Sequence, residues 1–131
     1  MTQTDTLKLI YPELSYKVVG VLFEAYNTLG SGHKESVYQK ALALLFLRHG
    51  IRFSEQHQVD LIVNDTIITR GRVDFLIEEK ILLELKTGDY FRPINIKQLY
   101  TYLKSTNLKL GILSNFTSRG LIFKRIVNLY P

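Results

Sequence analysis

The sequence contains no cysteine, which excludes a disulfide-stabilised scaffold and any zinc site with cysteine ligands. It also has no internal repeat, no low-complexity stretch and no linker rich in proline and glycine. Its longest unbroken apolar run, residues 41–47, has seven residues, whereas a helix needs about 20 to cross a bilayer. The first residues are polar and lack the layout of a signal peptide. We therefore expect one soluble, cytoplasmic domain over residues 1–131, with no membrane partner.

The composition is typical of a folded globular chain. Hydrophobic residues make up 46% of the sequence and charged residues 22%, a balance that argues against disorder. A chain of this length buries about two thirds of the surface that it exposes when unfolded. The apolar content is sufficient to build that core.

The net charge of +5 is unevenly distributed along the chain. Residues 1–84 carry nine Lys and Arg against eleven Asp and Glu, a net charge of −2. Residues 85–131 carry eight Lys and Arg against one Asp, a net charge of +7. A basic half of this kind suits a polyanionic partner such as nucleic acid. A solvated surface with scattered lysines explains the charge equally well, so the charge alone leaves both interpretations open.

Hydrophobic periodicity predicts two helices, then strands interrupted by one further helix. Pro12 and Gly30 are favourable residues for the start and the stop of the first helix, and Asn64-Asp65 is typical of a hairpin turn. The apolar start of the third strand indicates a central position in the sheet. The order α-α-β-β-β-α-β-β indicates a mixed α/β (α+β) domain. The helices are expected at residues 12–29, 34–49 and 95–105, and the strands at 59–63, 67–77, 81–86, 109–114 and 121–127.

Two carboxylates and a lysine are expected to meet on adjacent strands. Glu84 and Lys86 are two residues apart in one strand and therefore point to the same face. A tight turn between this strand and the preceding one makes Asp74 a direct or diagonal neighbour of Glu84, within about 8 Å. Carboxylates so close repel each other, and Mg²⁺, which binds oxygen ligands, relieves that repulsion. The same three residues could instead form a salt-bridge cluster at a sheet edge.

Two helical pairs of side chains are candidates to join this site. Glu35 and Tyr38 share one face at the start of the second helix. There, a glutamate ordinarily only favours the helix dipole, and a tyrosine is ordinarily part of the core. Gln98 and Tyr102 are four residues apart on the third helix, where the ordinary interpretation is a solvated glutamine and a half-buried tyrosine.

An aromatic pair, Tyr90 and Phe91, precedes Arg92 in the segment that follows Lys86. An aromatic pair beside an arginine could stack the bases of an unpaired nucleic-acid strand. Packing of both rings beneath the loop is the alternative, and the sequence leaves both open.

In their order and spacing, these residues resemble those of the GxxExxY proteins, a small branch of the PD-(D/E)XK nuclease superfamily. The likeness runs from about residue 29 to residue 127. No proline precedes Asp74, a departure that the superfamily often tolerates. The matching segments are Gly32-x-x-Glu35-x-x-Tyr38, Arg72-x-Asp74, Glu84-Leu85-Lys86, Gln98-Leu99, and residues 108–111 with 115–116.

The resemblance implies a restriction-endonuclease-like core, with a central mixed sheet flanked by helices. Asp74 and Glu84 would bind Mg²⁺ or Mn²⁺, and Lys86 would assist the water nucleophile. Glu35 would correspond to an extra helix carboxylate near the metal and would be a third metal ligand and catalytic residue. Gln98 and Tyr102 match the Q-x-x-x-Y element of the RecB-like nucleases, which supports the active site and the nucleic-acid strand. The full set expected to bind nucleic acid or to support the site is Gln98, Tyr102, Tyr38, Arg72, Arg92 and Lys97.

The function that follows is that of a metal-dependent nuclease hydrolysing phosphodiester bonds in DNA. The alternative is a non-catalytic module that keeps the nuclease fold and binds nucleic acid or another protein. The small size of the chain favours a homodimer, or a larger protein partner, for gripping a duplex.

Overall fold

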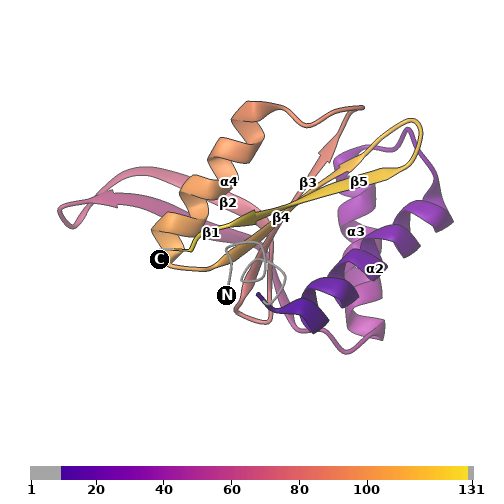
Figure 1. Ribbon diagram of the computed structural model, residues 1–131, viewed down its shortest axis with the longest axis horizontal. Coiled ribbons are helices and arrows are strands. Elements are labelled where there is room, and N and C mark those ends of the chain that lie inside the picture. The colour runs from indigo at the N-terminus through magenta and orange to yellow at the C-terminus, as the bar shows by residue number, and fades with distance from the viewer. Residues whose placement is uncertain (1–9, 130–131) are drawn as a thin grey trace.

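The computed structural model describes residues 10–129, in which three helices surround one five-stranded sheet (Figure 1). The helices are α2 (Pro12–Leu29), α3 (Glu35–Arg48) and α4 (Pro93–Thr106). The strands are β1 (Phe53–Val63), β2 (Thr66–Ile77), β3 (Ile81–Thr87), β4 (Leu110–Phe116) and β5 (Leu121–Val127). Within these residues, no helix combines the length and the apolar character needed to cross a membrane.

The sheet is mixed and has the strand order β1-β2-β3-β4-β5. Strands β3 and β4 are parallel, because α4 crosses over between them, and the other neighbouring strands are antiparallel. The central strand is β3, and all residues from Ile81 to Leu85 are buried, as its apolar start predicted. The prediction of a mixed sheet flanked by helices is therefore confirmed.

The helices cover opposite faces of the sheet (Figure 1). One core lies under α2 and α3, where Leu22, Phe46 and Leu83 have no exposed surface. The other lies under α4, where Leu82 and Leu103 are equally buried. Alternate residues of β3 thus enter different cores, and a polar side chain in this strand must find its partners inside the protein.

Two helices differ by one or two residues from their expected bounds. Helix α4 begins at Pro93 rather than at residue 95, because a proline in the first turn lacks only an N–H that would have no partner there. Helix α3 begins at Glu35, one residue later than expected. Helix α2 has the expected bounds, and Gly30 follows it with a positive φ of 73°.

Strand β1 is longer than the sequence pattern indicated, because it begins at Phe53 rather than at residue 59. Its first half is polar and largely exposed, so it lacks the alternating hydrophobic pattern that marks a strand. It forms by pairing with β2 from Phe53↔Ile77 onward. At the other end, Asn64 and Asp65 both have positive φ and form the predicted hairpin turn. This hairpin extends from the body of the molecule (Figure 1).

Candidate active site

Asp74 and Glu84 face each other across the β2–β3 pair. The paired register ends just before them, at Phe75↔Leu83, and the Asp74 N–H donates a hydrogen bond of 2.8 Å to Oε1 of Glu84. In return, the Leu85 N–H donates to Oδ2 of Asp74 at 2.7 Å. The spacing predicted direct or diagonal neighbours, and these bonds make them direct neighbours. Both strands are interior strands, so the pair does not lie at a sheet edge.

The Glu84 carboxyl is buried, with 7% of the residue exposed. Burial is the main cause that raises its pKa to about 8, and the neighbouring Asp74 carboxylate adds to the rise. The Asp74 N–H and Lys86 act in the opposite direction but do not offset the burial. With a pKa of about 8, Glu84 holds a proton at neutral pH in the metal-free protein, and a bound cation would displace that proton to solvent.

Lys86 lies beside Glu84, with its Nζ 3.9 Å from Oε2 of the carboxyl. Its side chain is 29% exposed, so the ammonium group lies between the buried pair and solvent. An ammonium group offers three hydrogen-bond donors and a positive charge. In this position it can orient a water molecule or stabilise a phosphate oxygen next to the carboxylates.

Glu35 occupies the first turn of α3 and contributes a third carboxylate to the electrostatics of the site. Partial burial raises the pKa of Glu35, Lys86 lowers it, and Asp74 raises it further. Over residues 10–129, however, no three His, Asp or Glu side chains are close enough to hold one metal ion. The structure thus groups Asp74 with Glu84 and leaves Glu35 at the edge of the pair.

The carboxylate pair offers the donor set of a hard divalent cation. Oε1 of Glu84 and Oδ2 of Asp74 each accept a backbone N–H, which fixes both carboxyl groups in place. Oε2 of Glu84 lies 3.9 Å from Nζ of Lys86, and the carboxyl oxygens retain lone pairs for further ligands. Mg²⁺ is ordinarily held by one or two carboxylates with water or phosphate as its other ligands. The residues present fit that requirement.

Tyr38 lies within the core, close to the start of α3. It has no exposed surface, its ring stacks on Phe116 at 4.0 Å between centroids, and its hydroxyl donates to the Gly30 carbonyl at 2.6 Å. These contacts fix the turn between α2 and α3, and with it the start of α3 that carries Glu35. Tyr38 is therefore a buried residue that connects the α2–α3 turn to β4.

Tyr102 reaches the site from α4 and packs on the backbone of β2. Tyr102 is 7% exposed. Burial is the main cause that raises the pKa of its hydroxyl, and the Glu84 charge raises it further. A hydrogen bond with the backbone of Arg72 lowers the pKa. A Cβ placed on Gly71 would lie 2.6 Å from the Tyr102 hydroxyl oxygen. Only glycine at residue 71 therefore leaves room for the tyrosine in this position.

An open pocket of about 480 Å³ continues from Tyr102 between β2 and α4. Its polar lining comes from exposed side chains, which include Arg70, Lys97 and Gln98. Arg72 and Arg92 are also exposed, at β2 and at the start of α4. Four of the predicted nucleic-acid residues therefore lie on the surface: Gln98, Arg72, Arg92 and Lys97.

Replacing Gly71 by alanine should destabilise the protein by about 1–3 kcal/mol, because the added methyl group overlaps Tyr102. The backbone of Gly71 does not have a positive φ, so this contact alone opposes the change. In a double-mutant cycle, Tyr102→Ala should cost less in the Gly71→Ala background than in the wild type. Urea unfolding measures all four proteins.

The control for that series is Gly20→Ala on the exposed side of α2, where an added Cβ meets nothing within 4 Å. It should stabilise the protein by about 0.5–1 kcal/mol, since alanine favours a helix more than glycine does. A Gly71→Ala protein as stable as the wild type would contradict the packing of Tyr102 described above.

The two aromatic residues after β3 have separate places. Phe91 is half-buried and packs against the core beneath α4, whereas Tyr90 is 68% exposed. The loop that carries Tyr90 is fixed from both sides. Asn115 donates to the carbonyls of Gly88 and Tyr90, and Asp89 accepts the Ser118 N–H at 2.9 Å. Tyr90 is thus an exposed ring on an anchored loop.

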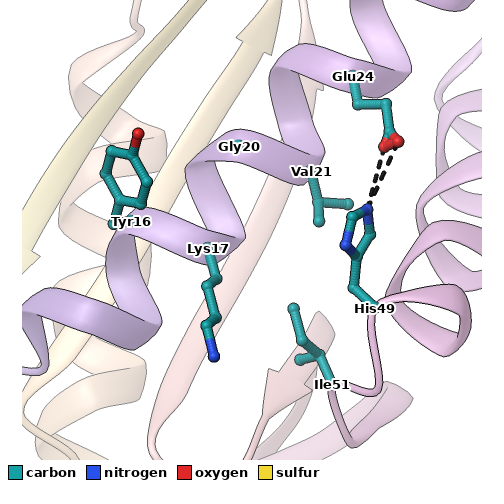
Figure 2. A pocket seen from close by; sticks show the side chains of 7 residues that line it. All are labelled: Tyr16, Lys17, Gly20, Val21, Glu24, His49 and Ile51. Carbon is teal, nitrogen blue, oxygen red and sulfur yellow. Dashed lines mark hydrogen bonds and ion pairs between the residues drawn. The ribbon is translucent and has the colours of Figure 1, made fainter.

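A second cavity, of about 420 Å³, lies between α2 and the end of α3 (Figure 2). His49 reaches across it to Glu24, with Nε2 and Oε2 3.1 Å apart. Both side chains are about half exposed, so the pair joins the two helices weakly. This cavity shares no residue with the Asp74 and Glu84 pair, and the sequence had singled out none of its lining residues as functional.

Sequence reasoning missed Gln39 and Gln56, whose side-chain amides join α3 and β1 to Asp74. Neither residue belongs to a recognisable motif. The feature that marks Gln56 is its positive φ within a strand, and this is visible in the structure but not in the sequence.

The sequence of residues 12–126 matches the family model of the PD-(D/E)XK nuclease superfamily. Comparison with curated proteins returned no match. Two similar crystal structures are of the alkaline exonuclease LHK-Exo from Laribacter hongkongensis. One has a TM-score of 0.50 at 19% identity, covering 66% of this chain and 52% of that chain. The other, a complex with dAMP, has a TM-score of 0.50 at 14% identity, covering 82% and 76%.

At these identities the structural likeness establishes the fold, and the chain spans about half of the exonuclease in the first of the two structures. The family match covers nearly the whole of the described chain, and it includes Asp74, Glu84 and Lys86. The chain therefore belongs to the PD-(D/E)XK nuclease superfamily.

Proposed function

We propose that this protein is a metal-dependent nuclease that hydrolyses phosphodiester bonds in DNA. The observation that carries the proposal is the buried Asp74 and Glu84 pair with Lys86 beside it. The buried Glu84 carboxyl, with a pKa of about 8, is costly to keep charged. An ion pair with only a structural role would not require a carboxyl in such an unfavourable place. The membership in a nuclease superfamily supports this proposal. Nucleases of this superfamily generally use divalent metal ions.

In the proposed mechanism, Asp74 and Glu84 would hold Mg²⁺ or Mn²⁺. When bound, such an ion neutralises charge on the phosphate and lowers the pKa of a water molecule. The protein groups perform the remaining work. The backbone N–H groups of Asp74 and Leu85 keep the carboxylates aligned, and Lys86 donates a hydrogen bond to the attacking water or to a phosphate oxygen. Glu35 adds negative charge at the edge of the site.

The substrate surface proposed here has two parts. The pocket lined by Arg70, Lys97 and Gln98 offers positive charge and amide groups for a phosphate backbone. The exposed ring of Tyr90 offers a face on which an unpaired base can stack. We also propose that the chain belongs to the GxxExxY branch, because Tyr38 fixes the turn before α3 and Glu35 lies in its first turn.

A cleavage panel tests the proposal. Linear, circular, branched and single-stranded DNA, with RNA of the same sequence, are incubated with Mn²⁺ or Mg²⁺ and with excess chelator. We expect cleavage of DNA that requires the metal and is lost in Lys86→Ala. Lys17→Ala is the matched control, because Lys17 lines the α2–α3 cavity away from the site, and it should cleave normally.

Equal cleavage by Lys86→Ala and the wild type would overturn the mechanism. Salt-sensitive binding of DNA without cleavage of any substrate would instead favour the non-catalytic binding module.

A further inference from the structure

Gln56 has a backbone conformation that a strand residue rarely adopts. It lies in β1 between Glu55 and His57, and its φ is +48°. This left-handed region is unfavourable for residues other than glycine, asparagine and aspartate. Glu55 pairs with Phe75 and His57 pairs with Val73, so Gln56 lies opposite Asp74. The strained residue and the candidate metal ligand are thus neighbours across the two strands.

The Gln56 side chain uses this position to contact Asp74 directly. Its Nε2 donates to Oδ1 of Asp74 at 3.2 Å and to Oε1 of Gln39 at 3.0 Å. Gln39 in turn donates from its own Nε2 to Oε1 of Glu55 at 3.3 Å. The chain of donors ends on two carboxylates, which accept but do not donate when ionised, so both amide orientations are fixed by the network.

Asp74 is thereby held by both of its carboxyl oxygens. Oδ1 accepts the Gln56 amide, while Oδ2 accepts the Leu85 N–H at 2.7 Å. Leu85 stands between Glu84 and Lys86 in β3. A turn of the Asp74 carboxylate would therefore disturb the strand segment that carries the other two residues of the site.

The network also links the helix that carries Glu35 to Asp74. Gln39 is four residues after Glu35 on α3, so both side chains lie on the same face of that helix. The contacts run from α3 through Gln39 and Gln56 to Asp74. The polar first half of β1, which no hydrophobic pattern explains, is the segment that supplies the middle of this link.

We propose that Gln56 is a positioning residue, whose strained backbone places its amide on Asp74 and fixes that carboxylate for metal binding. The metal-binding purpose of Gln56 rests on the nuclease function proposed above. Its contact with Asp74 rests on the hydrogen bonds alone. Partners of this kind, behind a metal ligand, typically contribute about 10–100-fold to metal affinity or activity.

The test separates the amide from the backbone. Gln56→Gly removes the amide and relieves the positive φ, whereas Gln56→Ala removes the amide and keeps the strain. Gln58→Ala is the matched control, because Gln58 is on the same strand and its amide donates to Asp60. Two properties are measured without DNA: the Leu85 amide proton resonance of the metal-free protein, and the affinity for Mn²⁺ by calorimetry.

Both Gln56 variants should move the Leu85 resonance upfield, since its hydrogen bond to Asp74 loosens, and both should lower Mn²⁺ affinity by about 10–100-fold. Gln56→Gly should melt at a higher temperature than Gln56→Ala, and Gln58→Ala should match the wild type in resonance and affinity. An unchanged Leu85 resonance and an unchanged Mn²⁺ affinity in Gln56→Gly would overturn the proposal. It would also be overturned if the changes in resonance and affinity across the variants followed their melting temperatures and not the loss of the amide. If the wild type neither binds Mn²⁺ nor cleaves DNA, the nuclease proposal fails, and a shifted Leu85 resonance would still support the positioning role.

Discussion

Replacing Glu84 by glutamine should reduce cleavage by about 1000-fold or more, and it should also remove most of the pH dependence of stability of the metal-free protein. The loss of activity follows because the glutamine amide is neutral, whereas a divalent cation is held by the negative charge of a carboxylate. The stability change follows from the environment of Glu84, which is buried next to Asp74 and has a pKa of about 8.

The direction of the stability change follows from proton binding. The pKa of Glu84 is about 8 in the folded protein and 4.5 in an ordinary environment. Between these two values the folded state binds a proton that the unfolded state has released, so the free energy of unfolding falls as the pH rises. The contribution is present in full below pH 4.5 and is lost as the pH rises through 8. Its size is on the order of 5 kcal/mol, at 1.36 kcal/mol for each pKa unit.

Urea unfolding at a series of pH values between 5 and 9, with chelator present, measures this effect. The wild type should lose stability across the range, while Glu84→Gln should lose much less. Glu79→Gln is the control, because Glu79 is exposed on the β2–β3 turn and should leave the wild-type slope unchanged. A wild-type protein with constant stability from pH 5 to 9 would contradict the burial of an ionisable Glu84.

Much of this site was predictable from local sequence patterns. The short β2–β3 turn and the apolar start of β3 together determine the register of these two strands. That register alone makes Asp74 and Glu84 neighbours. The identity of the carboxylate pair therefore depends on short-range information, which a single sequence contains.

The remainder depends on contacts between segments far apart in the chain. The start of β1 has no hydrophobic pattern and becomes a strand only by pairing with β2. Gln56 acquires its positive φ and its contact with Asp74 through that pairing. Likewise, the burial of Tyr38 against Phe116 depends on how α3 packs on β4. No spacing rule indicates such contacts, so sequence patterns alone did not reveal them.

The affinity for Mn²⁺ should rise about 100-fold between pH 5.5 and 7.5 and level off above pH 8, since a proton must leave Glu84 before the carboxylate can bind the cation. Below the pKa of about 8, each pH unit increases the ionised fraction of this carboxyl about tenfold. The pKa of Glu35 is also raised, so a smaller dependence from this carboxyl adds to the acid end of the range.

Calorimetric titration at pH 7 in two buffers of different protonation enthalpy counts the protons released. We expect about one proton for each Mn²⁺ bound by the wild type, because Glu84 is then still protonated. Glu35→Gln should release nearly the same number, whereas Glu84→Gln should bind weakly and release almost none. Strong binding by Glu84→Gln would show that the cation is held elsewhere. Binding by the wild type without proton release would show that Glu84 is already ionised at pH 7. In that case, the folded protein would stabilise the Glu84 carboxylate more strongly than Lys86 and the Asp74 N–H alone can.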